Sequence, residues 1–175
     1  KLEVVANYWE QVLFINNWQT QRISSLIIEK FFGTVANKRI IILGFAFKCN
    51  TNDTRESPSI QIAKDLIENG AKLFINDPKV TRKQIEMELG LKELENDLEF
   101  QGSWSFVRDI YSASENADAI VIATEWEEYR NLDWSKLPYL LRKPSWIFDT
   151  RNIIPKEIFK QKDINFWQIG TCLAN

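Results

Sequence analysis

The segment RIIILGF (39–45) constrains the fold most, because it is apolar throughout and does not alternate with polar residues. A strand with that pattern is covered on both faces, as strands of parallel sheets are. Further apolar runs at 71–77, 117–124, 144–150 and 164–170 predict four more strands. One helical pattern begins at Ser57-Pro58, and two others cover 81–90 and about 106–115. Residues 91–103 are polar and have the character of a variable insertion. Strands separated by helices predict a doubly wound, Rossmann-like α/β sheet.

A long helical segment precedes this sheet. Apolar residues recur at spacings of three and four from Val5 to Phe31, which predicts helix over residues 1–36. Asn16-Asn17 interrupts the pattern and is a candidate cap for a second helix, and Gly33 is a candidate end. The apolar face exceeds what a small domain needs, so we expect it to pack against a missing domain or a second subunit. The division is therefore a helical segment (1–36) and an α/β domain (37–175).

Four loops follow the predicted strands at their carboxyl ends, where open parallel sheets bind ligands: 45–57, 77–80, 124–130 and 149–153. The first is unusually long and polar. A dinucleotide fingerprint, G-x-G-x-x-G, would stand at its start, but the chain has Gly44 followed by Phe-Ala-Phe. We conclude that this loop does not hold a pyrophosphate as the fingerprint does.

Two arginines and one lysine are candidates for binding anions at these loops. Lys48 and Arg55 lie on the first loop, and Arg151 follows the fourth strand at the same edge. The alternative for each arginine is a local ion pair: Arg55 with Asp53 or Glu56, and Arg151 with Asp149. The residues alone leave both alternatives open.

Composition excludes several functions. The chain has no histidine, two cysteines far apart and a net charge of −2, which argues against a histidine-based metal site, a disulfide framework and binding to nucleic acid or membrane. Cys49 is a passive loop residue on this interpretation, and we assign no catalytic or metal-binding residue. The glutamates at 125, 127 and 128 are interpreted as helix-start residues. Because the chain begins with Lys1 and its only methionine is Met87, we expect a piece of a longer protein.

Several segments in order resemble one family. ILGFAFKCNTNDTRESPSIQIAKDLIENGAKLFINDPKV (42–80) is similar to the start of the C-terminal domain of the UDP-glucose/GDP-mannose dehydrogenase family, and in particular to its UDP-glucose 6-dehydrogenases. ADAIVIATEWEEYRNLDW (117–134) and FDTRNI (148–153) follow in the family's order, and YWEQVLFINNWQTQRIS (8–24) resembles the end of its central helical region. The resemblance is weakest over 88–105.

The resemblance implies that the catalytic and substrate-binding functions lie in different domains of a longer protein. An N-terminal NAD-binding domain and a cysteine nucleophile, which oxidise the C6 alcohol of UDP-glucose to the carboxylate of UDP-glucuronate, lie outside this chain, so the chain is expected to be inactive alone. Phe47, Lys48 and Arg151 are implied as substrate-binding residues, and Arg55 as a contact for the NAD phosphates. Cys49 does not match the nucleophile's motif. The resemblance also implies a cytoplasmic homo-oligomer.

The chain departs from the family in two places: Cys49-Asn50 stands where Lys-Asp is frequent, and Thr150 where glycine is common. Two alternatives to UDP-glucose oxidation stay open. One is a dehydrogenase of another nucleotide sugar, such as GDP-mannose or a UDP-amino sugar. The other is a non-catalytic nucleotide-binding or assembly module.

Overall fold

The computed structural model describes residues 7–93, 101–159 and 163–170. Their elements, in chain order, are α1 (Asn7–Lys30), β1 (Arg39–Leu43), α2 (Pro58–Glu68), β2 (Lys72–Asn76), α3 (Arg82–Leu89), β3 (Ser103–Phe106), α4 (Ile110–Ser114), β4 (Ala119–Ile122), α5 (Glu127–Arg130), α6 (Leu137–Leu140), β5 (Trp146–Asp149), the 3-10 turn η1 (Lys156–Phe159) and β6 (Asn165–Gln168).

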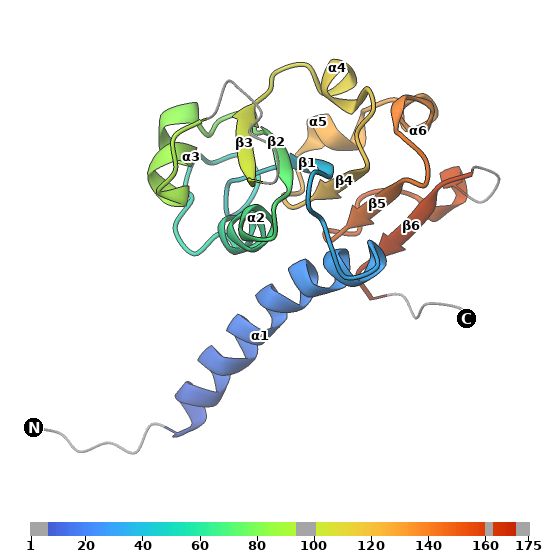
Figure 1. Cartoon of the computed structure of the whole chain (residues 1–175). Helices are drawn as coiled ribbons and strands as arrows, with labels where there is room; N and C mark the ends of the chain where they lie inside the picture. Colours follow the sequence, from blue (N-terminus) through green and yellow to red (C-terminus); the bar gives the residue numbers. More distant parts are fainter. Residues whose placement is uncertain (1–6, 94–100, 160–162, 171–175) are drawn as a thin grey trace, which may run out of the picture.

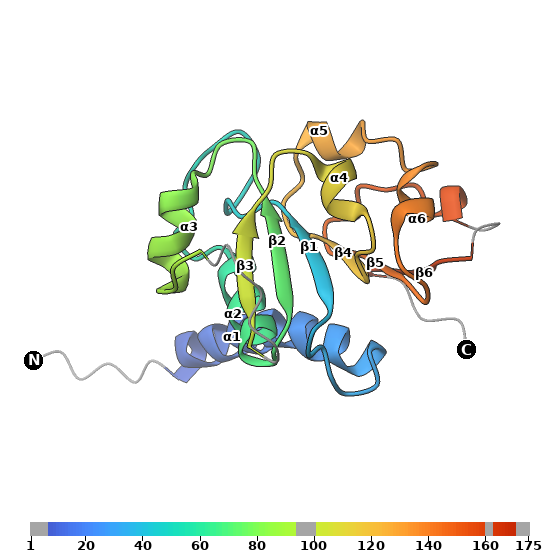
Figure 2. The same cartoon turned by 45° about the horizontal axis from the view of Figure 1, so that its top comes forward.

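The described strands form one parallel sheet in the order β3-β2-β1-β4-β5-β6. The chain first moves outward from β1 to β2 and β3, then returns to the other side of β1 and moves outward again through β4, β5 and β6. Helices α1 and α2 lie on one face of this sheet, and α4 and α6 lie on the other (Figures 1 and 2). The expected doubly wound, Rossmann-like fold is thus confirmed.

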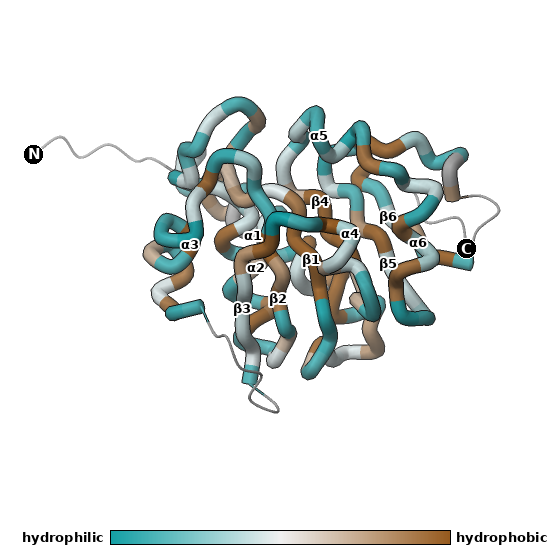
Figure 3. Tube along the Cα trace, turned by 90° about the horizontal axis from the view of Figure 1, so that it is seen from above, coloured by the Kyte–Doolittle hydropathy of each residue, from teal (hydrophilic) through white to brown (hydrophobic). Residues whose placement is uncertain are grey.

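The sheet's centre is the core of the molecule. Every residue of β4 and all of β1 except Arg39 are buried, as expected for strands covered on both faces. The hydropathy-coloured tube shows these central strands as the apolar interior, with hydrophilic segments around the rim (Figure 3). The continuous apolar runs in the sequence therefore correspond to the most deeply buried strands.

Strand β3 was not predicted, because the sequence pattern indicated a polar insertion over 91–103 followed by a helix around 106–115. Ser103–Phe106 instead pairs with β2 at the sheet's edge, and helix α4 begins only at Ile110. Trp104 packs into the core while Phe106 is half-buried. The Ser-Trp-Ser-Phe alternation is a two-residue period typical of a strand, but it spans too few residues to stand out. Residues 94–100 of the expected insertion lie outside the described residues.

Helix α1 is continuous, so the expected break at Asn16-Asn17 is wrong. Asn16 is exposed in the projecting half of the helix, where no packing contact forces a change of direction. The helix ends at Lys30, earlier than expected, and Gly33 N–H donates to Ile28 O (3.0 Å) with Gly33 at φ 86°. This left-handed glycine closes the helix as predicted.

Only the carboxyl-terminal part of α1 joins the domain. Ile27 and Phe31 are buried, and Ser24 hydrogen-bonds to Asp65 of α2. The amino-terminal half extends beyond the sheet (Figure 1) and exposes large apolar side chains, among them Tyr8, Trp9, Leu13, Phe14 and Trp18. None of the helices in the described ranges combines the length and the apolarity that crossing a bilayer requires.

Candidate functional site

The loops after β1, β2, β4 and β5 meet at the carboxyl edge of the sheet. The strand order reverses between β1 and β4, which pair directly. In open α/β sheets, ligands bind at such a reversal, outside the carboxyl ends of the strands. The four loops selected from the sequence therefore lie where this fold places its ligands.

Gly44 forms the closest contact at this reversal. It has φ 96°, and a Cβ added to it would lie 2.4 Å from Thr124 Cβ. The Thr124 hydroxyl donates to Ala46 O at 2.7 Å. Gly44 is thus required both by its backbone conformation and by the close approach of the chain after β4.

Asp77, at the end of β2, holds the start of the long loop. Its Oδ2 accepts hydrogen bonds from Phe45 N (2.7 Å) and Ala46 N (3.0 Å), and its Oδ1 accepts from Lys79 N and Val80 N, each at 2.8 Å. The carboxylate is buried. A carboxylate that accepts several backbone N–H groups holds those groups in a defined geometry. Asp77 therefore fixes the backbone of two neighbouring loops at once.

A second set of contacts joins the long loop to the β2 and β4 ends. The Trp126 indole N–H donates to Asp77 Oδ2 at 3.3 Å, and Lys79 Nζ lies 6.0 Å from the Trp126 ring centroid. Lys79 Nζ also donates to Asn50 O at 3.1 Å. Asp77, Trp126 and Lys79 were not among the site residues selected from the sequence. The sequence signal for them was an aspartate directly after an apolar strand, which indicates a candidate site but not the residues that bond to the aspartate.

Phe47 and Lys48 follow the fixed part of this loop and are exposed. Phe47 N donates to Asp53 O at 2.9 Å, which closes the loop over residues 47–53. Within the ranges that the structure describes, no ion pair involves Lys48. Its charge is thus available to a ligand at the mouth of β1.

Arg151 lies at the end of β5 and reaches across to β4. Its Nε donates to Ala123 O at 2.7 Å and lies 3.6 Å from Glu125 Oε2. The expected alternative, an ion pair between Arg151 and Asp149, does not form in the structure: Asp149 Oδ1 accepts the Arg151 backbone N–H at 3.0 Å instead. The guanidinium is therefore directed towards the β4 end.

Asp149 anchors the loop that carries Arg151. The carboxylate is fully buried, and its Oδ2 accepts from Ile153 N (2.8 Å), Ile154 N (2.9 Å) and Gln168 Nε2 (3.0 Å). These bonds fix residues 151–154 against β6. Asp77 and Asp149 thus have the same role at two strand ends: each buries a charge to hold a loop.

The Phe47-Lys48 segment and Arg151 are connected through residues 123–124. Arg151 bonds to Ala123 O, and the next residue, Thr124, bonds to Ala46 O, one position before Phe47. The structure thereby brings the Phe47-Lys48 segment and the Arg151 loop to one stretch of the carboxyl edge.

Arg55 is different, because the local alternative is the one observed. Its Nε and Nη2 bond to the two carboxylate oxygens of Asp53 at 2.9 and 2.7 Å. The Arg55 side-chain hydrogen bond lowers the pKa of the Asp53 carboxyl to about 2. The Arg55 side chain is nevertheless highly exposed, so the guanidinium can still meet a group supplied from outside the domain.

Cys49 and Ser57 contribute less than their positions in the sequence suggest. Cys49 is a half-buried free thiol that packs against the core, with only a 3.8 Å contact from Asn50 Nδ2 to its sulfur; Cys172 lies outside the described residues. Ser57 occupies the N-cap position of α2, but its side chain makes no capping bond. No group of acidic or sulfur ligands suited to a metal occurs among the residues that the structure describes.

The fold and this edge define a Rossmann-like domain whose ligand site lacks the glycine-rich fingerprint. The sequence model described as "UDP-glucose/GDP-mannose dehydrogenase family, UDP binding domain" matches residues 41–156, and the chain belongs to this family.

Curated relatives agree with this assignment. UDP-glucose 6-dehydrogenase of Gallus gallus is 44% identical over 170 residues, which cover 97% of this chain and 34% of that protein. UDP-glucose 6-dehydrogenase 4 of Arabidopsis thaliana is 40% identical over 94% of this chain and 36% of that protein. The chain therefore spans about a third of the length of these relatives.

Solved structures share the fold. A UDP-glucose dehydrogenase from Pyrobaculum islandicum superposes over 90% of this chain and 31% of its own, with a TM-score of 0.61 at 23% identity. A GDP-mannose dehydrogenase from Pseudomonas aeruginosa covers 94% of this chain and 35% of its own, with a TM-score of 0.62 at 20% identity. At these identities the likeness establishes the fold alone.

Proposed function

We propose that residues 37–175 are the nucleotide-sugar-binding domain of an NAD-dependent UDP-glucose 6-dehydrogenase, which oxidises UDP-glucose to UDP-glucuronate in two hydride transfers. The observation that carries this proposal is the link between Arg151 and the Phe47-Lys48 segment through residues 123–124. A UDP-sugar carries a diphosphate, and Lys48 and Arg151 supply positive charge on that stretch of the edge. The relatives named UDP-glucose 6-dehydrogenase support this substrate over other nucleotide sugars.

In this proposal each residue has a distinct role. Lys48 acts as a point charge near the diphosphate, and Phe47 offers an exposed ring beside it. Arg151 exchanges its contact with Glu125 for a ligand oxygen, to which a planar guanidinium donates well. Asp77 and Asp149 hold the two loops in place before the ligand arrives, which lowers the ordering cost of binding.

NAD enters this proposal as a cofactor of the longer protein. The turn after β1 has Gly44 but not the further glycines of a dinucleotide fingerprint, so this domain does not itself cradle NAD. Arg55 has a narrower role, because its exposed guanidinium can meet the NAD phosphates from across a cleft after release from Asp53. We assign no catalytic residue to this chain, and we expect it to be inactive alone because the proposed cysteine nucleophile lies elsewhere.

We further propose that residues 1–36 contact the rest of the protein or a second subunit of a homo-oligomer. The exposed aromatic and aliphatic side chains of α1 support this assignment, because large apolar patches of this kind usually mark interaction sites. The assembly-module alternative rests on the same helix. The cytoplasm is the proposed location, since its reducing conditions keep a thiol such as Cys49 free.

Calorimetric titration of the chain with UDP-glucose, UDP-glucuronate and GDP-mannose tests the assignment. We expect the UDP-sugars to bind most tightly, and Arg151→Gln and Lys48→Gln each to weaken binding about tenfold or more, because each removes a charged hydrogen-bond donor. Arg22→Gln, the same loss of charge on α1, is the matched control and should bind as the unaltered chain does. Tighter binding of GDP-mannose would contradict the substrate, and unchanged binding in both variants would contradict the site.

A further inference from the structure

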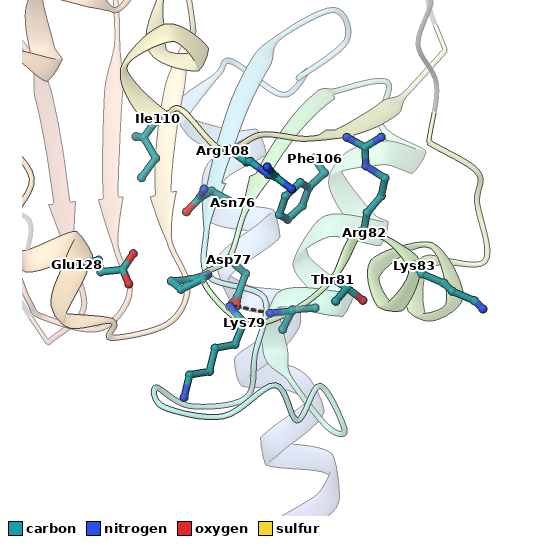
Figure 4. A pocket seen from close by; sticks show the side chains of 12 residues that line it. Asn76, Asp77, Lys79, Thr81, Arg82, Lys83, Phe106, Arg108, Ile110 and Glu128 are labelled. Atoms are coloured by element: carbon teal, nitrogen blue, oxygen red, sulfur yellow. Dashed lines mark hydrogen bonds between the residues drawn. The ribbon is translucent and has the colours of Figure 1, made fainter.

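A hollow of about 690 Å³ lies at the carboxyl ends of β2 and β3, beside the start of α3 (Figure 4). Its rim is formed by the loops after β2 and β3, and Glu128 of α5 lies on the side opposite Arg82. The loops that carry Phe47, Lys48 and Arg151 do not line it. Nothing in the proposed UDP-sugar site accounts for this hollow.

The hollow is basic although the chain as a whole is slightly acidic. Lys79, Arg82, Lys83 and Arg108 line it, against the acidic residues Asp77 and Glu128. The Asp77 carboxylate is already occupied by four backbone N–H groups. Arg108 makes no ion pair with any residue in the described ranges. Arg82 is paired with Glu93 at 2.8 Å and Lys79 Nζ donates to Asn50 O at 3.1 Å, so Arg108 is the cation that most favours an anion here.

The backbone that carries these cations is held in position. Asn76 Nδ2 donates to Val107 O at 2.8 Å, and Val107 N donates to Ile75 O at 2.9 Å, so the chain just before Arg108 is tied to β2. On the other side, the N–H groups of Lys79 and Val80 are bonded to Asp77. Two cationic loops are thus fixed to consecutive residues of one strand end.

The hollow also has an aromatic lining residue, Phe106. The Arg82 guanidinium carbon lies 6.0 Å from the Phe106 ring centroid, and Figure 4 shows Phe106 beside Arg108. Glu93 holds Phe106 and Arg82 next to each other, because it accepts Phe106 N–H at 2.7 Å and pairs with Arg82 Nε at 2.8 Å. A ring and a guanidinium plane are surfaces on which a flat heterocycle stacks.

We propose that this hollow is a second nucleotide site, which binds a nucleoside phosphate with the phosphate at Arg108 and the base against Phe106. Its volume falls within the roughly 300–1,000 Å³ of small-molecule sites. Its position outside the carboxyl ends of two parallel strands is where this fold class binds ligands. The site is separate from the proposed UDP-sugar edge; Lys79, which reaches Asn50, lies between the two.

Titration of the whole chain with ADP and with pyrophosphate tests this site. We expect ADP to bind, and Arg108→Gln to weaken ADP and pyrophosphate binding about tenfold, since a charged donor is lost. Phe106→Leu should weaken ADP more than pyrophosphate. Arg22→Gln is the matched control for charge, and thermal unfolding of each variant verifies the fold.

Two results would overturn the proposal: no ADP binding by the unaltered chain, or ADP binding that Arg108→Gln leaves unchanged. Arg151→Gln separates the two sites, because it should weaken UDP-glucuronate but not ADP. Loss of ADP binding in Arg151→Gln with no effect of Arg108→Gln would place ADP in the edge site and contradict a second one. Failure of the UDP-sugar assignment would leave the Arg108 result unaffected.

Discussion

The tripeptide Asp-Thr-Arg occurs twice at the carboxyl edge, at 53–55 and at 149–151, with opposite structures. In the first, Asp53 binds the Arg55 side chain through both carboxylate oxygens. In the second, Asp149 is fully buried and binds backbone N–H groups, so Arg151 reaches Ala123 and Glu125 instead.

The position relative to the strand explains the difference. Asp149 is the last residue of β5 and is covered by β4 and β6, so its charge must be satisfied by nearby N–H groups. Asp53 lies in a loop where water competes, and a neighbouring arginine is its best partner. The same three residues therefore produce an anchored loop in one place and a local ion pair in the other.

The largest expected effect is on stability at Asp149. Asp149→Ala would leave the backbone N–H groups of Arg151, Ile153 and Ile154 without their acceptor, at a cost of about 3–5 kcal/mol in the free energy of unfolding. For a chain of this size the melting temperature should fall by about 10 °C, measurable by circular dichroism.

Asp53→Ala is the matched control and should leave the melting temperature unchanged, because that carboxylate is exposed to solvent. The melting temperature of Asp149→Asn, which keeps one oxygen acceptor, should lie between those of the two alanine variants. Equal melting temperatures for the two alanine variants would show that the buried and exposed aspartates do not differ as described.

For the middle threonines of the two segments, we expect the larger loss of stability in the first segment, the opposite of the order for the aspartates. Thr54 is buried and its hydroxyl donates to Glu88 Oε1 at 2.5 Å, so Thr54→Val removes a bond to a charged group, worth about 1.5–3 kcal/mol. Thr150 donates to Ile122 O at 2.7 Å, but that oxygen also accepts Thr150 N–H at 3.3 Å. Thr150→Val should therefore cost only about 0.5–1 kcal/mol. Denaturant unfolding of both variants measures the difference; a larger loss in Thr150→Val would contradict the contacts.

The smallest effect is the titration of Asp53. A carbon-detected NMR titration should give its carboxyl a pKa of about 2, against 3.8 for the unperturbed group. Because this pKa is lowered in the folded chain, any stabilisation by the pair is present above about pH 4 and is lost as the pH falls towards 2. Arg55→Gln should return the pKa towards 3.8. A normal pKa in the unaltered chain would mean that Arg55 is not held by Asp53 in solution.

Much of the fold could be predicted from the sequence, because β1 and β4 are continuous apolar runs and Pro58 and Gly33 mark helix ends. Strand β3 could not be predicted, since its alternation of polar and apolar residues spans only four positions between polar segments. The break expected in α1 did not occur, because an exposed asparagine such as Asn16 is tolerated within a helix.

The candidate site was predictable only in outline. Apolar strands followed by polar residues selected loops that the structure brings together at the carboxyl edge, but hydrogen bonds between distant residues decide what each side chain does. Asp77 binds backbone N–H groups of residues 45 and 46, some thirty positions earlier, and nothing local in the sequence indicates this. The two Asp-Thr-Arg segments show the same limit, because burial alone separates them.

The central claim is that UDP-sugars bind where the β1, β4 and β5 ends meet. An amide NMR map of the chain titrated with UDP-glucuronate tests it most directly. We expect the largest shifts at residues 45–48, 123–125 and 150–154, with little change at residues 81–84 and 106–108. Shifts confined to the β2 and β3 ends, or the absence of any shift, would contradict the account.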